Sequence, residues 1–334
     1  LIKAQNADVA VPREPERNLP DRDHDAAESN PDNQAILNKT GTITKHVSRV
    51  AFPAFSLNRG EGCAISENAY WGLQTYLGLR ENLAANEGAR SFIHESTRDR
   101  TPLGHGHRDQ IRDLPIEQIR EMYRQAIRQL INELAETEEF FRAGIVPIDI
   151  TEDDPFTGDR TDHEDEIIGT KEKNDEYAYQ WATVQLVGNA VPLVLDARPV
   201  RRGESRKEIV EDLLDSAEEL VHVDNVLMDR EFDSQHVLEM ISQRGISYVV
   251  PKRMQTSEKA QAKRLLQRDQ DRYETDRKLH LGKNEWHETT LIYRQKEDSE
   301  HDDHRQYSVF MTNCGSGHLI EYGYRWEIDS DYCK

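Results

Sequence analysis

The sequence predicts an α/β protein built around a mixed sheet, with a helical region in front of it. Residues 45–142 carry apolar side chains at helical spacing, whereas from residue 143 short apolar runs alternate with amphipathic helices. Two of the apolar runs contain or lead into an acid, Asp149 and Asp229. An acid in a buried strand is costly unless it is paired or binds a cation. The pattern that predicts the sheet therefore also predicts a site at its edge.

Length and composition limit the class of protein. The 334 residues suit one large domain with an insertion, or two domains. No run of about 18 apolar residues occurs and no secretory signal follows Leu1, so we expect neither a membrane span nor export. Cys63, Cys314 and Cys333 fit neither zinc nor disulfide spacing. We therefore expect a cytoplasmic protein.

The chain is strongly acidic, with 63 acidic residues against 43 basic ones and a net charge of -20. Nucleic-acid binders are usually basic, because neutralising phosphate supplies much of their affinity. Acidic surfaces also suit concentrated salt, where the Debye length is about 3 Å at 1 M and repulsion is screened. We interpret the charge as adaptation to the cytoplasm of a halophile, which leaves DNA open as a partner.

The N-terminal part divides into two stretches. Residues 1–44 are polar and interrupted by prolines, which predicts a disordered arm. Residues 45–142 are predicted to be helical, most clearly over Ile116–Ala135, where one apolar stripe recurs at helical spacing. Arginines accompany this helix, so the region fits a small DNA-binding domain; a plain helical lid fits equally well.

From residue 143 the chain alternates between strands and helices. The predicted order is a strand at Ile145–Ile150, strands at Tyr177–Val187 and Ala190–Ala197 around a Gly188-Asn189 turn, a helix opened by a Ser205/Glu208 capping box, a strand ending at Asp229, a short helix stopped by Gly245, and a strand at Ile246–Val250. Three strands, a helix, a strand, a helix and a strand is the order of an RNase H-like core. We predict this core for residues 143–334.

An insertion is predicted at about residues 252–313. Its first part, residues 252–283, holds ten basic residues against five acids. This stretch reads either as a solvated helix with ordinary i,i+4 ion pairs or as a patch that tracks phosphate. Glu288–Arg294 and Gln306–Asn313 read as two further strands, which makes the insertion β-rich.

A third acid stands near the end of the chain. The segment from Ser316 is predicted to be helical, and Tyr322, Arg325 and Asp329 are spaced i, i+3 and i+7 on one face. Together with Asp149 and Asp229, Asp329 would complete a set of three acids from distant parts of the chain. We interpret the set as one shared cation site.

These segments resemble a known family. Asp149 in IDIT, Asp229 in DREF and the stretch YGYRWEID resemble the DDE transposases of bacterial and archaeal insertion sequences. The likeness is to the cut-and-paste branch with a β-strand insertion, in its haloarchaeal versions, over roughly residues 110–334. The hallmark of that branch is a helix reading Tyr, two residues, Arg, three residues and Glu.

The resemblance implies metal-dependent cleavage and transfer of DNA strands, that is, DNA transposition and recombination. It implies two Mg²⁺ or Mn²⁺ ions, bridged by Asp149, with Asp229 on one ion and Asp329 on the other. Its partners would be double-stranded DNA at the element ends and at the target, bound by a homodimer. We assign DNA binding to Tyr322 and Arg325, and also to Arg230, Lys263, Arg264 and Arg268.

The chain departs from the family pattern in two respects. Asp329 stands where the family carries Glu, and Glu327 would point to another face of the helix. The chain also begins at Leu1 and stops at Lys334, before the family's Lys and C-terminal tail. We therefore expect a fragment or a decayed element. Two alternatives remain: a catalytically inactive DNA-binding remnant and an RNase H-like nuclease.

Two histidine-containing stretches are predicted to be ordinary loops. Gly104–His107 reads as a polar loop rather than a metal site, and His301–His304 as a solvated acidic turn.

Overall fold

The structure is a computed structural model of the chain. It describes Thr42 and residues 45–314, apart from residues 61, 80–83, 97, 99, 138–139, 171–175, 189–192, 283–284, 297–298 and 300. The predicted disordered arm, residues 1–44, lies outside the described residues except for Thr42. The predicted helix with Tyr322, Arg325 and Asp329 also lies outside them. The division into an arm, a helical region and a catalytic domain stays a prediction.

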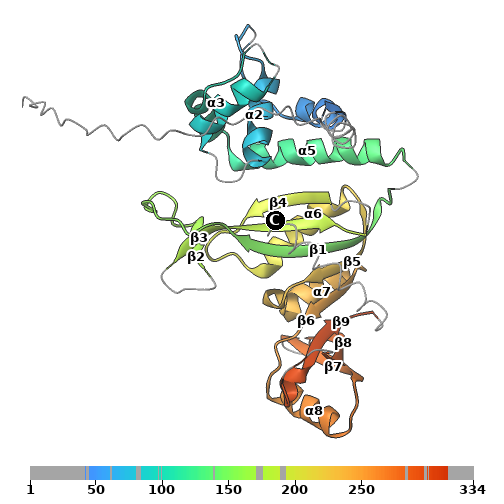
Figure 1. The fold of residues 1–334 in the computed structure, drawn as a ribbon. Coiled ribbons are helices and arrows are strands. Elements are labelled where there is room, and N and C mark those ends of the chain that lie inside the picture. Colours follow the sequence, from blue (N-terminus) through green and yellow to red (C-terminus); the bar gives the residue numbers. More distant parts are fainter. Residues whose placement is uncertain are drawn as a thin grey trace, which may run out of the picture. The chain divides into compact units, whose positions relative to one another are not determined.

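The region before the sheet is helical, as predicted (Figure 1). Its elements are η1 (Phe52–Ala54), α2 (Glu67–Leu79), α3 (Ala85–Glu95), α4 (Gly104–Arg112) and α5 (Ile116–Leu134). Helix α5 covers the predicted range, but the buried face differs from the predicted stripe: Met122, Ala126 and Ile131 are buried, whereas Tyr123 and Leu134 of the stripe are exposed. No helix among the described residues is long and apolar enough to cross a membrane.

The prediction of a loop at Gly104–His107 was wrong, because these residues form the first turn of α4. A Cβ at Gly104 would lie 2.5 Å from the backbone of Ala85, so only glycine allows this close approach to α3. His107 is buried and stacks on Tyr70, with ring centroids 6.3 Å apart. Helix–helix packing therefore decides the conformation of this segment.

The sheet follows the predicted order of strands. Its first strands are β1 (Ala143–Glu152), β2 (Ile167–Gly169), β3 (Tyr177–Leu186), β4 (Leu193–Pro199), β5 (His222–Met228) and β6 (Ser247–Pro251). Strand β1 pairs antiparallel with β3 and parallel with β5, β3 pairs antiparallel with β4, and β5 pairs parallel with β6. With helices leading into β5 and β6, this is the predicted RNase H-like core.

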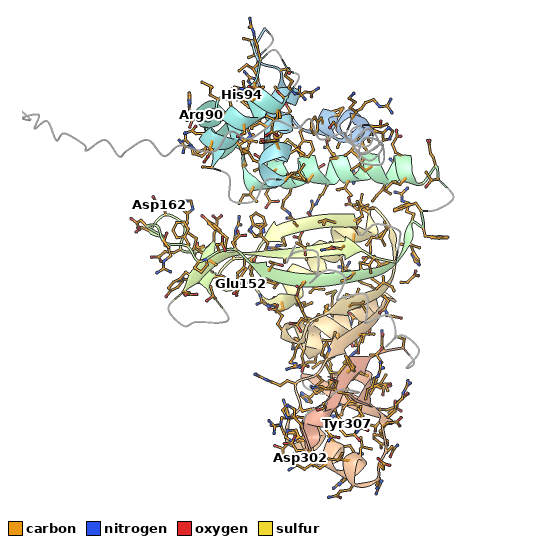
Figure 2. All side chains as sticks on the ribbon, viewed as in Figure 1. Arg90, His94, Glu152, Asp162, Asp302 and Tyr307 are labelled. Atoms are coloured by element: carbon orange, nitrogen blue, oxygen red, sulfur yellow. The ribbon has the colours of Figure 1, made fainter. Side chains whose placement is uncertain are left out.

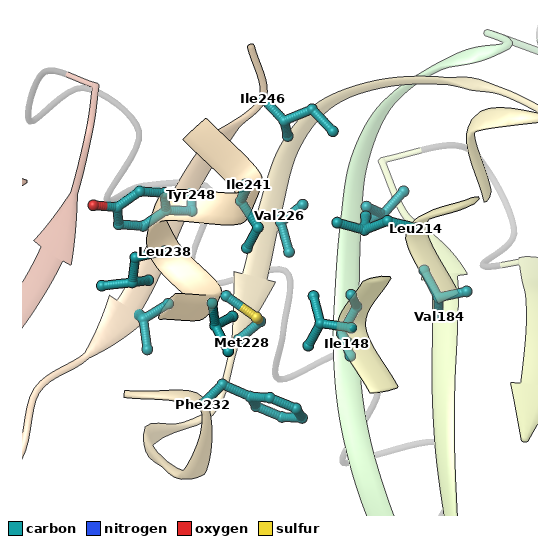
Figure 3. Packing of buried hydrophobic residues seen from close by; sticks show 14 of the residues in the cluster. Ile148, Val184, Leu214, Val226, Met228, Phe232, Leu238, Ile241, Ile246 and Tyr248 are labelled. Carbon is teal, nitrogen blue, oxygen red and sulfur yellow. The ribbon is translucent and has the colours of Figure 1, made fainter. Parts of the chain in front are cut away.

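Helices α6 (Arg206–Glu218) and α7 (Gln235–Gln243) cover the sheet and bury their apolar faces. The predicted capping box is present: the Ser205 hydroxyl accepts from Glu208 N, and Glu208 Oε2 accepts from Ser205 N. Figure 3 shows part of the core cluster, which includes Ile148 of β1 and Met228 of β5.

The insertion continues the sheet beyond β6. It consists of α8 (Thr256–Gln267), β7 (Arg272–Gly282), β8 (Glu285–Gln295), η3 (His304–Gln306) and β9 (Tyr307–Thr312). Strand β9 pairs antiparallel with both β6 and β8, and β8 pairs with β7. The insertion is therefore β-rich, as predicted. The basic stretch 252–283 is divided between α8 and β7, and only part of it is helical.

Candidate metal centre

Asp149 and Asp229 lie side by side because β1 and β5 are parallel neighbours. The pairing register places Ile148 opposite Met228, and the residue that follows each of them is an acid, Asp149 or Asp229. Asp229 immediately follows β5, and Asp149 lies in β1 opposite Thr183 of β3. The carboxyl ends of parallel strands are where open α/β sheets place ligands. In the structure these two acids are thus neighbours, as the sequence predicts.

A third carboxylate joins them. Ligand atoms of Asp149, Asp229 and Glu231 all lie within 4.8 Å of one another, and each of the three residues is half-buried. All donors are carboxylate oxygens, the ligand type that hard cations such as Mg²⁺ and Mn²⁺ prefer. The donor set therefore fits a divalent metal of this class.

Glu231 was not predicted from the sequence. It lies in η2 (Arg230–Phe232), a single turn that begins directly after Asp229. The Asp229 side chain accepts a hydrogen bond from Arg230 N at this turn, while Phe232 is fully buried. Because the turn is anchored at both ends, Glu231 is directed back toward Asp149. The only sequence signal was its place two residues after Asp229, which does not fix a direction.

One basic side chain pairs with a carboxylate of the centre, and a second pairs with a neighbouring carboxylate outside it. Arg206, the first residue of α6, lies 2.9 Å from Glu231 Oε2. Lys252, just after β6, lies 3.3 Å from Asp233 Oδ2. Three carboxylates held this close repel one another, and opposite charges within a few ångströms reduce that repulsion. Arg206 thus supplies part of the charge compensation that a bound cation would complete.

The other predicted site residues are spread more widely. Arg230 borders a cleft that Asp229 also borders. Lys263 and Arg264 are exposed on α8, and Arg268 caps the C-terminal end of that helix. None of these three borders that cleft. Their role in DNA binding stays a prediction, as do the roles of Tyr322, Arg325 and Asp329, which lie outside the described residues.

The fold and the centre define a class: an RNase H-like α/β protein with a carboxylate cluster at the ends of its parallel strands. No family model matches the chain, and no curated protein matches it. A solved structure described as a pre-cleavage Mos1 transpososome is similar over 58% of this chain and 61% of that one, at 9% identity and a TM-score of 0.21. The chain thus matches less than two thirds of that protein. The fold assignment rests on the strand order instead.

Proposed function

We propose that this chain is a transposase that catalyses metal-dependent DNA strand cleavage and strand transfer of an insertion sequence. The observation that supports this most is the position of Asp149 and Asp229 on adjacent parallel strands of an RNase H-like sheet. The resemblance of the segments IDIT, DREF and YGYRWEID to DDE transposases supports it independently.

Asp149 and Asp229 would hold two Mg²⁺ or Mn²⁺ ions. Such a pair of ions, when bound, activates an attacking hydroxyl and stabilises the leaving oxygen of a phosphodiester. The carboxylates supply charge and position for the ions, and the buried ends of β1 and β5 hold both side chains in place. Arg206 keeps Glu231 directed to the same point.

Two acids are candidates for the third position. Asp329 is implied by the family resemblance, whereas Glu231 lies within the cluster. Glu231 already has Arg206 as a partner. We therefore assign the third metal-holding role to Asp329 and a supporting role to Glu231.

The test is metal-dependent nicking of a supercoiled plasmid that carries the element ends. Asp149→Asn and Asp229→Asn are each expected to lower the rate more than about 100-fold, because loss of a mere supporting contact already costs about 10–100-fold. Glu231→Gln should lie in that lower range. Asp224→Asn is the matched control, because Asp224 lies in β5 but is exposed and outside the cluster.

Joining of the cut ends to a second DNA distinguishes the alternatives. Nicking with joining supports a transposase, and nicking without joining supports an RNase H-like nuclease. DNA binding without nicking in any divalent metal would contradict catalysis and favour an inactive DNA-binding remnant. Equal activity of Asp149→Asn and Asp224→Asn would remove Asp149 from the site.

A further inference from the structure

A cleft of about 540 Å³ opens next to Asp229. Its walls come from segments that are distant in the sequence: the η2 turn, the residues after β6, helix α8, the β8–β9 connection and β9 itself. The cationic residues that line it are Arg230, Lys252, Arg253, Lys259, Lys296 and Arg305. Asp229 is the one carboxylate among the described residues that line it. The cleft therefore joins the metal centre to a basic surface.

The positive charge of the cleft is only partly neutralised. Lys252 is paired with Asp233 at 3.3 Å, and Arg305 with Asp303 at 3.0 Å. Arg230, Arg253 and Lys259 form no ion pair with any residue that the structure describes. In a chain of net charge -20, a cleft with several uncompensated cations attracts anions selectively.

Hydrogen bonds between its segments hold the cleft together. Lys252 N donates to Val309 O at 2.7 Å, which ties the end of β6 to β9. The hydroxyl of Tyr307, labelled in Figure 2, donates to Gln270 O at 2.7 Å, which ties β9 to the segment after α8. The cations thus project from connected elements, and Met254 and Phe310 give the cleft an apolar part.

We propose that this cleft binds the sugar–phosphate backbone of the DNA strand that passes Asp229, with Arg253 and Lys259 as phosphate contacts. The identity of the polymer rests on the function proposed above. Three features favour a strand over a small anion: the cations are distributed along a cleft larger than one phosphate, an apolar part suits deoxyribose, and Asp229 lies in the wall. A strand bound there reaches the carboxylates.

This assignment differs from the sequence-based one. Lys263 lies one turn beyond Lys259 on α8, and it does not line the cleft. The His301–His304 stretch, predicted to be a solvated turn, contributes two lining histidines. The insertion therefore forms one wall of the site beside the metal centre, in addition to extending the sheet.

The experiment measures binding of the full chain to a fluorescent DNA duplex in EDTA, at several salt concentrations, so that cleavage plays no part. Arg253→Gln/Lys259→Gln should weaken binding and make the slope of log affinity against log salt shallower by about two, close to 0.9 for each lost phosphate contact. The charge-matched control is Arg201→Gln/Arg202→Gln, two exposed residues of the β4–α6 connection outside the cleft. Its slope should stay at the wild-type value.

A third variant, Arg253→Lys/Lys259→Arg, keeps both charges and should keep the wild-type slope, which assigns the effect to the charges. A wild-type urea midpoint of the Gln variant excludes misfolding as the cause. An unchanged slope in the Gln variant, an equal loss in the control pair, or a wild-type chain that binds no duplex would each overturn the inference. Plasmid nicking with Mg²⁺ is measured in parallel. If the wild-type chain nicks the plasmid but the Gln variant keeps the wild-type slope, the proposed function stands and the role of the cleft is refuted. If the Gln variant has a shallower slope but the wild-type chain does not nick, the cleft binds DNA and the proposed catalytic function is refuted.

Discussion

At the residue scale, the buried hydroxyl of Tyr248 joins the core to the insertion. It donates to Thr289 Oγ1 at 2.8 Å and lies 2.8 Å from His287 Nε2, while His287 Nδ1 lies 2.6 Å from Glu239 Oε2. Thr289 in turn donates to Thr312 O, so the Tyr248 proton is needed for Thr289. A chain of hydrogen bonds therefore links α7, β6, β8 and β9.

Because of this network, we expect the free energy of unfolding to fall at alkaline pH. Burial raises the pKa of the Tyr248 phenol well above its ordinary value of 10.0, and burial likewise raises the pKa of Tyr293 to about 12. Above about pH 10 the unfolded chain releases these protons while the folded chain keeps them, so stability is full below that pH and falls as pH rises. Tyr248→Phe should make this fall shallower by up to about 1.4 kcal/mol per pH unit.

Urea unfolding at pH values from about 7 to about 11 measures this slope. At neutral pH the same variant should lose about 1–3 kcal/mol, because His287 and Thr289 lose a buried partner. Tyr177→Phe, half-buried at the start of β3, controls for the loss of a phenol elsewhere. An identical alkaline slope in wild type and Tyr248→Phe would refute the assignment.

At the element scale, a buried ion network fastens helix α5 to strand β4 and helix α6. Arg120 donates to Asp196 at 2.7 Å and to Asp212 at 3.0 Å, and Arg124 reaches Asp196 at 2.8 Å. The Asp196 side chain is only 2% exposed. A carboxylate this deeply buried is tolerated because two guanidinium groups surround it.

Arg120→Met should therefore destabilise the protein by about 3 kcal/mol, the lower part of the range for breaking a buried pair, because Arg124 remains. The matched control on the same helix is Arg128→Met. Arg128 pairs with Glu219 at 2.9 Å, but both side chains are well exposed, so about 0–1 kcal/mol is expected. Denaturant midpoints and slopes give both values. Equal losses would mean that the buried network does not fasten α5.

At the scale of the whole molecule, the sheet connects the metal centre to the insertion. The path β1-β5-β6-β9-β8 is hydrogen-bonded throughout, so strands of the core and of the insertion belong to one sheet. The carboxylates lie at β1 and β5, and the basic cleft begins where β6 meets β9. One continuous hydrogen-bonded ladder therefore positions both the metal-binding groups and the phosphate-binding groups.

The net charge gives a prediction for the whole chain. With an excess of 20 acidic residues, self-repulsion should be screened as the Debye length falls from about 10 Å at 0.1 M salt to about 3 Å at 1 M. The urea midpoint should rise over this range of NaCl. Sucrose at matched osmolality controls for general exclusion of a solute from the surface. A midpoint that falls with NaCl would contradict adaptation to concentrated salt.

Local sequence patterns determined most of the elements. The apolar stripe from Ile116, the Ser205/Glu208 capping box and the apolar run that ends at Asp229 each specify an element, because the pattern is contained within a few turns or one strand. The prediction at Gly104 failed for the opposite reason: residues 104–107 carry no apolar side chain, and the conformation of Gly104 depends on its contact with Ala85.

The sequence alone also placed Asp149 and Asp229 at one site, because each acid interrupts or ends an apolar run and the family resemblance pairs them. Only the tertiary structure added Glu231 to that cluster and gathered Arg253 and Lys259 beside it. The direction of Glu231 depends on the η2 turn, and the cleft depends on pairing between β6 and β9. The direction of Glu231 and the cleft both result from tertiary contacts, and the spacing of apolar residues within a single helix or strand does not encode such contacts.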